Sequence, residues 1–181
     1  PAFAGSTFYD LPAGSQAFRD VKAALRQTGM RVHDVEFVVV DEYFIPEAVL
    51  PLFETAAELG AKVLTICGED HVGVRLVDHC QKLCALAGGF NIRIELEFMA
   101  WRRIGTLDQA TDLLRRVDDD RMGILLDALH LSRAGSEPEA LAVVDPAWLM
   151  SVQLCDAVAE KPRDPEGLIR EARGGRLMVG Q

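Results

Sequence analysis

Cysteine is scarce in this sequence, and long apolar runs are missing. The 181 residues include four cysteines, and none of them form the CxxC spacing of zinc or dithiol motifs. The apolar runs fall far short of the ~20 residues that a transmembrane helix needs. The first residues lack the charged and apolar regions of a signal peptide. These absences predict a cytoplasmic protein with reduced thiols and no membrane association.

Positive charge is also in short supply. The chain has 19 Lys and Arg against 28 Asp and Glu, which gives a formal net charge of -9. This balance repels the phosphate backbone of nucleic acids, so we expect a small-molecule ligand and no nucleic acid. Only four histidines are present, too few for the multinuclear zinc cluster of a nuclease.

Helical and extended patterns alternate along the chain without an internal linker. Apolar residues at helical spacing predict three helices that end at Gly29, Gly60 and Gly88. Further helices are predicted over 107–117, 137–144 and 165–173. Extended segments are predicted at 31–40, 62–67, 91–98, 122–127 and 151–155, with a last extended piece at 176–179. This alternation indicates an α/β protein with a parallel sheet.

Two architectures fit this alternation, an open doubly wound sheet and a (β/α)8 TIM barrel. Glu97, Asp127 and Gln153 end successive strands at intervals of 30 and 26 residues. A barrel of about 250 residues has ~31 residues in each of its eight units. The segment 91–98 also places Glu95 and Glu97 on one face and apolar side chains on the other. Open parallel sheets carry helices on both faces, so this charged face favours the lumen of a barrel.

The chain length gives such a barrel about six units, whereas a closed barrel has eight. We therefore expect residues 1–181 to form a single (β/α)-barrel domain that is incomplete at both ends. An open barrel leaves two unpaired strand edges, which favours aggregation. The sequence leaves open whether the chain forms a homo-oligomer.

Three side chains with oxygen donors end successive predicted strands. Glu97, Asp127 and Gln153 should converge at the mouth of the barrel, where TIM-barrel enzymes place their sites. Three oxygen ligands suit Mg²⁺ or Mn²⁺ better than zinc. The spacing alone supports a purely structural role for these three residues equally well. In that case, Glu97 pairs with an arginine, Asp127 caps the next turn and Gln153 bonds to the backbone.

The same region carries three short segments with a wider resemblance. They are Leu-Glu-Phe-Met at 96–99, Gly-Ile-Leu-Leu-Asp-Ala-Leu-His at 123–130 and Val-Gln-Leu-Cys-Asp at 152–156. Together they resemble the xylose isomerase-like TIM-barrel superfamily of sugar phosphate isomerases and epimerases. The most specific part is the strand-end Glu97 followed 30 residues later by Asp-x-x-His.

This resemblance implies a metal centre. It makes Glu97 and Asp127 ligands, with His130 holding a substrate oxygen beside the metal. Gln153 falls at a third ligand position that is usually His, and a fourth ligand, a Glu, is expected beyond Gln181. The implied cofactor is a divalent metal, with Mn²⁺ or Mg²⁺ favoured and Co²⁺ or Zn²⁺ as alternatives.

The implied activity is the isomerisation or epimerisation of a small sugar or hydroxy-ketone. Glu97 would remove a proton α to a carbonyl, and the cation would stabilise the enediolate. Gln153 instead matches dehydroshikimate dehydratases, whereas Met99 stands where those enzymes are expected to carry His. A lyase like 3-dehydroshikimate or inosose dehydratase, and a non-catalytic metabolite-binding protein, remain alternatives. Arg102 and Arg103, just beyond Glu97, can bind an anionic group of a substrate.

Overall fold

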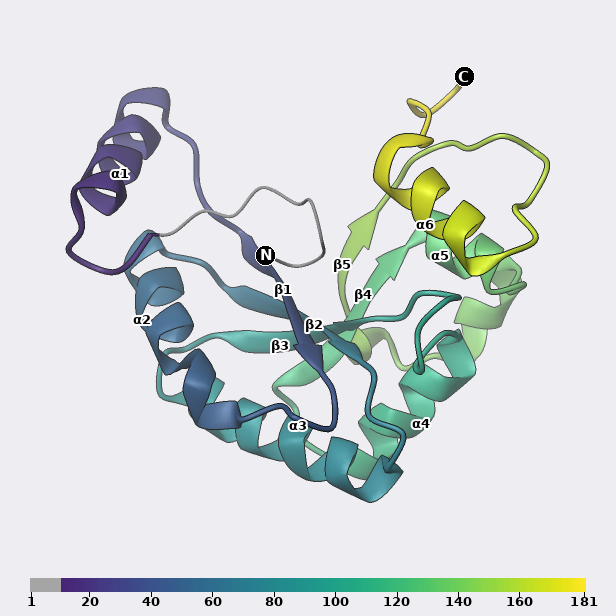
Figure 1. Cartoon of the computed structure of the whole chain (residues 1–181), viewed down its shortest axis with the longest axis horizontal. Coiled ribbons are helices and arrows are strands. Elements are labelled where there is room, and N and C mark those ends of the chain that lie inside the picture. The colour runs from purple at the N-terminus through teal and green to yellow at the C-terminus, as the bar shows by residue number, and fades with distance from the viewer. Residues whose placement is uncertain (1–10) are drawn as a thin grey trace.

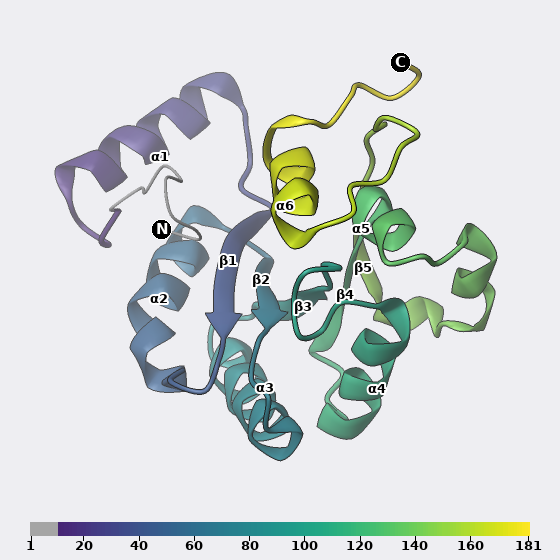
Figure 2. The same cartoon turned by 45° about the vertical axis from the view of Figure 1, so that its right-hand side comes forward.

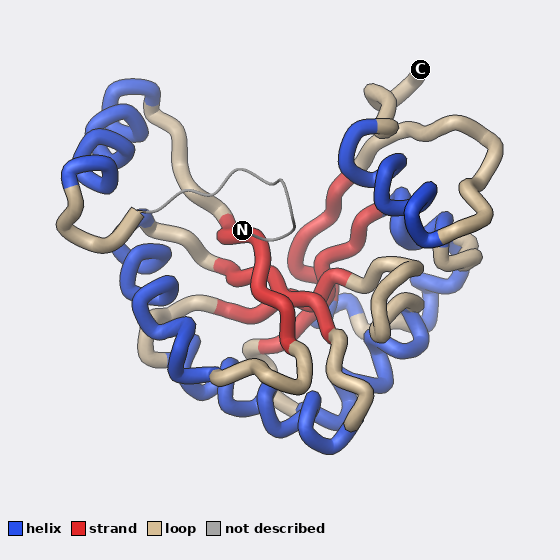
Figure 3. Tube along the Cα trace, in the orientation of Figure 1, coloured by secondary structure: helices blue, strands red, loops and turns tan. Residues whose placement is uncertain are grey.

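Five parallel strands form one curved sheet, and helices lie along its outer side (Figures 1 and 3). The structure is a computed structural model, and it describes residues 11–181. The strands are β1 (Asp34–Val40), β2 (Val63–Gly68), β3 (Arg93–Glu97), β4 (Met122–Asp127) and β5 (Leu149–Gln153). The α-helices are α1 (Gln16–Thr28), α2 (Leu50–Leu59), α3 (Gly73–Gly88), α4 (Leu107–Val117), α5 (Ala128–Arg133) and α6 (Pro165–Gly174). Short 3₁₀ turns are η1 (Pro46–Val49), η2 (Pro138–Val143) and η3 (Pro146–Trp148).

The strand order separates the two architectures that the sequence allowed. The strands pair in the order in which they occur in the chain, and every pair is parallel. A doubly wound sheet reverses its strand order at a switch point, whereas a barrel keeps a sequential order. The expected TIM-barrel fold is therefore confirmed. Within the described residues, the sheet has open edges at β1 and β5.

Local sequence signals explain where the main helices begin and end. α4 begins after Thr106, whose side chain accepts a hydrogen bond from the backbone N–H of Gln109. α2 ends at Gly60, which has a φ of +83°, a conformation that glycine adopts without strain. The apolar faces of α2, α3 and α4 pack on the outside of the sheet and form the core.

The inner face of the sheet is polar. Glu95 is fully buried and accepts a hydrogen bond from the Thr65 hydroxyl on β2, at 2.8 Å. Its neighbours Ile94 and Leu96 point to the other face and join the core against the helices. The charged face of the segment 91–98 therefore lies where the barrel interpretation placed it.

The segment 176–179 is not a strand, contrary to expectation. Leu177 makes only an isolated antiparallel bridge with Asp156, so the described residues contain five strands rather than six. Arg176 holds this segment beside α6 because its Nε donates to the carbonyl of Ala172. The predicted helix at 137–144 is the 3₁₀ turn η2, and α5 was not predicted. Among residues 11–181, no helix has the length and apolarity to cross a membrane.

Gly123 allows β5 to approach β4 closely. A Cβ atom at Gly123 would lie 2.5 Å from the carbonyl oxygen of Trp148 and 2.6 Å from the Met150 side chain. We expect Gly123→Ala to lower the free energy of unfolding by about 2–3 kcal/mol, because backbone must move. Gly174→Ala is the control, since a Cβ there meets nothing within 4 Å. Urea unfolding measures both variants, and equal stabilities would contradict this packing.

Candidate metal centre

Glu97, Asp127 and His130 converge at the carboxyl ends of β3 and β4. Each offers one ligand atom, and these atoms lie within 4.8 Å of one another. The Nε2 of His130 is 3.4 Å from Glu97 Oε1 and 4.0 Å from Asp127 Oδ2. All three residues are buried. The two carboxylates that the sequence predicted as ligands thus lie beside the histidine predicted to hold substrate.

Asp127 explains why His130 lies in this cluster. It ends β4 and is also the N-cap of α5. Its Oδ1 accepts hydrogen bonds from the backbone N–H groups of Leu129, at 2.7 Å, and His130, at 3.2 Å. The cap fixes the first turn of α5 and turns the His130 ring toward the carboxylates. The capping role proposed from the sequence is confirmed, and it leaves Oδ2 to face the cluster.

Arg176 is a site residue that the sequence analysis missed. Its Nη1 donates to Asp127 Oδ2 at 2.6 Å and contacts the Cys155 sulfur at 3.5 Å. The guanidinium therefore places a positive charge beside two buried carboxylates. No local sequence pattern predicts this contact, because Arg176 lies 49 residues from Asp127 and follows α6.

Gln153 lies on β5 directly opposite Asp127 in the parallel register. Its amide nitrogen donates to Glu36 Oε1, at 2.7 Å, instead of to the backbone. This hydrogen bond uses the nitrogen, so the carbonyl oxygen is the atom that remains to bind a cation. The ligand role of Gln153 stays a prediction.

Burial sets the protonation of the cluster. It raises the pKa of Glu97 to about 8, and the charges of Asp127 and Glu36 act in the same direction, while Arg176 opposes them. Burial also lowers the pKa of His130 to about 4, against the charge of Asp127. His130 is therefore neutral at pH 7, the form in which imidazole binds metals.

The donor set fits a divalent cation. Two carboxylates suit a divalent cation, which would offset the repulsion between the buried acids, and the neutral imidazole of His130 can bind the cation or an oxygen beside it. The ring of Trp101 packs edge-on against His130, with centroids 5.1 Å apart. Nδ1 of His130 is buried and has no hydrogen-bond partner within residues 11–181. The ring is thus held by packing, with Nε2 facing the carboxylates.

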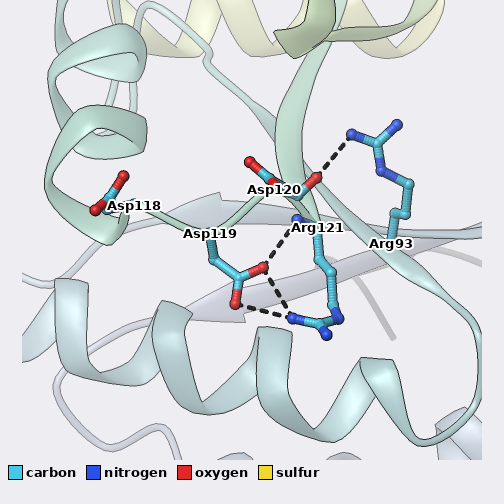
Figure 4. A pocket seen from close by; sticks show the side chains of 5 residues that line it. All are labelled: Arg93, Asp118, Asp119, Asp120 and Arg121. Carbon is cyan, nitrogen blue, oxygen red and sulfur yellow. Dashed lines mark hydrogen bonds and ion pairs between the residues drawn. The ribbon is translucent and has the colours of Figure 1, made fainter.

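A cleft of about 670 Å³ lies at the opposite ends of the strands (Figure 4). It is lined by Arg93, which begins β3, and by residues 118–121 before β4. Arg121 pairs with Asp119 at 3.2 Å, and Arg93 donates to the carbonyl of Asp120 at 3.0 Å. Barrel enzymes place their sites at the carboxyl ends of the strands instead. This cleft is therefore not the candidate site.

Comparison with known families agrees with the fold and with the motifs. The family described as xylose isomerase-like TIM barrel matches residues 2–176. The chain belongs to this family, and the resemblance drawn from the three motifs is confirmed.

Two curated relatives are enzymes. A 3-dehydroshikimate dehydratase of Pseudomonas aeruginosa is 32% identical over 111 residues, which are 58% of this chain and 18% of the relative. Inosose isomerase of Bacillus subtilis is 26% identical over 104 residues, 52% of this chain and 37% of the relative. The chain therefore spans well under half the length of either relative.

Solved structures show the same fold. A xylose isomerase-like TIM barrel/4-hydroxyphenylpyruvate dioxygenase fusion protein superposes with a TM-score of 0.75 and 23% identity, over 91% of this chain and 27% of the other. An IOLI protein with a binding zinc atom gives a TM-score of 0.74 and 18% identity, over 92% and 64% of the two chains.

Removing one charged ligand should weaken metal binding. We expect Asp127→Asn to lower the affinity for Mn²⁺ roughly tenfold or more, because hard cations depend on carboxylate charge. Asparagine can still cap α5, so the fold should persist. Asp78→Asn is the control, since Asp78 is exposed on α3 and pairs with Lys82. Calorimetry that finds equal Mn²⁺ affinity in wild type and Asp127→Asn would exclude this centre.

The buried carboxyl of Glu97 predicts a pH dependence for the metal-free protein. Its pKa is about 8 in the folded state against an ordinary 4.5, so folding retains a proton that unfolding releases. This contribution is full below pH 4.5 and is lost as the pH rises through 8. Glu97→Gln mimics the protonated form, so it should exceed wild type in stability above pH 8 by roughly 2–4 kcal/mol.

Urea unfolding with a chelator measures this difference at both ends of the range. Below pH 4.5 the two proteins should have equal stability, because Glu97 is protonated in both states. A wild type that is more stable than Glu97→Gln above pH 8 would contradict the electrostatics of the cluster.

Proposed function

We propose that this protein is a divalent-metal-dependent isomerase or epimerase of a small sugar or hydroxy-ketone. The observation that carries the proposal is the buried cluster of Glu97, Asp127 and His130 at the carboxyl ends of two barrel strands. Barrel enzymes place their chemistry at this end. The relatives include inosose isomerase, and the solved neighbours include a 3-keto-D-glucoside 4-epimerase, which supports the fold and this reaction class.

Glu97 is the proposed base. Its carboxyl group lies at the end of β3, is buried, and has His130 3.4 Å away. A bound divalent cation would favour the ionised form that can act as a base. It would take the proton from the carbon α to the substrate carbonyl and return it to the same or the neighbouring carbon. His130, being neutral, would hold a substrate oxygen through Nε2, which faces the carboxylates.

Arg176 adds a fixed positive charge to the same place. Its guanidinium lies against Asp127 and can bind a hydroxyl or carboxylate of the substrate through its remaining N–H groups. Glu97, Asp127 and the carbonyl oxygen of Gln153 are the proposed metal ligands. A bound divalent cation would supply a Lewis acid that favours loss of the α proton. The zinc atom of the IOLI protein supports a divalent metal on this fold.

A dehydratase is the second candidate, because the sequence identities favour it. Two 3-dehydroshikimate dehydratases are 32% and 31% identical to this chain over 111 residues. Arg176 would suit the carboxylate of such a substrate. Met99, however, which follows Glu97 by two residues, is buried and offers no proton to a departing hydroxyl. Both reactions share the removal of a proton α to a carbonyl, so Glu97 is the base in either case.

Deuterium exchange separates the two candidates. The Mn²⁺-loaded protein is incubated in D₂O with ketoses, hydroxypyruvate and dehydroshikimate. We expect NMR to detect deuterium exchange α to the carbonyl of a sugar or hydroxy-ketone. The exchange rate should fall about 100-fold or more in Glu97→Gln. The exposed Glu166→Gln on α6 is the control and should retain the rate.

Aromatic product from dehydroshikimate, without exchange into any sugar, would replace the isomerase proposal with the dehydratase. If no substrate reacted or exchanged deuterium while Mn²⁺ remained bound, a metabolite-binding protein would be favoured.

A further inference from the structure

A basic pocket lies on the outer rim, beside the candidate metal centre but separate from it. It has a volume of about 590 Å³ and is formed by the loop before α4, the end of α5 and the segment that leads into α6. Figure 2 shows these segments next to one another, with α6 above the loop between β3 and α4. None of Glu97, Asp127 and His130 lines it. Trp101, which packs on His130, does not line it either.

The charge of this pocket is opposite to that of the chain. Five cationic side chains line it: Arg102, Arg103, Arg133, Lys161 and Arg163. One carboxylate, that of Asp164, lies among the lining residues. The whole protein carries a net charge of -9, so such a concentration of positive charge marks a place that attracts anions.

Two of the five cations are neutralised by neighbours. Arg102 pairs with Glu69 at 2.6 Å. Arg133 makes a bidentate pair with Glu171, through bonds of 2.8 and 2.6 Å. These pairs hold the walls of the pocket in place, because each joins two different segments of the chain.

The other three cations have no carboxylate partner in the described part of the chain. No ion pair of residues 11–181 involves the side chain of Arg103, Lys161 or Arg163. Asp164 does not compensate them fully, because its Oδ1 accepts the backbone N–H of Gly167 as the cap of α6. The pocket therefore keeps uncompensated positive charge.

Helix dipoles add to this field. α4 and α6 have 11 and 10 residues, and their capping residues Thr106 and Asp164 both line the pocket. The amino end of a helix carries a partial positive charge. Side chains and backbone thus favour the same kind of ligand.

We propose that this pocket binds the phosphate group of a small molecule at a site distinct from the metal centre. Phosphate has several acceptor oxygens and up to two charges, which match two guanidinium forks and an ammonium group around one cavity. Nucleic acid fits less well, since the cations converge on one pocket and the rest of the surface is acidic.

Calorimetry with inorganic phosphate tests the site in the metal-free protein. A chelator is present, so the metal centre cannot hold the anion, and the result does not depend on the proposed activity. We expect saturable binding of one phosphate, weakened at least tenfold in the double variant Lys161→Gln and Arg163→Gln. These side chains are exposed, so the fold should persist. Arg103→Gln should weaken binding in the same direction.

The control removes two positive charges elsewhere. Lys62→Gln with Lys82→Gln changes the net charge equally, on exposed lysines outside this pocket. Phosphate affinity should stay unchanged in this control. Absence of phosphate binding, or an equal loss in both double variants, would overturn the proposal.

A phosphorylated sugar tests where the phosphate comes from. Binding tenfold tighter with Mn²⁺ than without it would show that one molecule spans the pocket and the metal centre. Equal binding with and without Mn²⁺ would identify a phosphate ligand that is separate from the metal centre. If the phosphorylated sugar did not compete with inorganic phosphate, the idea that both bind in this pocket would be overturned.

Discussion

The two carboxylate oxygens of Asp127 have different partners, and the arrangement of the candidate site depends on this difference. Oδ1 caps α5 and so fixes the position of His130, while Oδ2 faces Glu97, His130 and Arg176. An aspartate at the end of a barrel strand can serve both purposes because its two acceptors point in different directions. The two interpretations that the sequence suggested for Asp127, helix cap and ligand, are therefore compatible.

Much of the fold could be predicted because its signals are local. Glycine stops, capping residues and the alternation of 91–98 each act within a few residues, and they located the strands around Glu97 and Asp127. The barrel followed from a charged strand face that an open sheet cannot accommodate. The contacts of Arg176 could not be predicted, because they depend on how α6 packs. The bond from Gln153 to Glu36 likewise joins side chains 117 positions apart.

The buried acids place conflicting demands on the structure. Glu95, Glu97 and Asp127 are at most 5% exposed, and burying carboxylates opposes folding unless charge or hydrogen bonds compensate. Thr65 bonds to Glu95, and Arg176 bonds to Asp127. Burial, together with the charges of Asp127 and Glu36, raises the pKa of Glu97. Stability has been given up at the place where a base or a ligand is useful.

The bidentate pair between Arg133 and Glu171 links the last residue of α5 to α6. His130 lies one turn before Arg133, and Arg176 follows α6 closely, so the pair joins the supports of both residues. Glu97 and Gln153 instead rest on strands within the sheet. The site therefore has one half built into the sheet and another half supported by α5 and α6. A substitution at Arg133 or Glu171 would therefore disturb the supports of His130 and Arg176 at the same time.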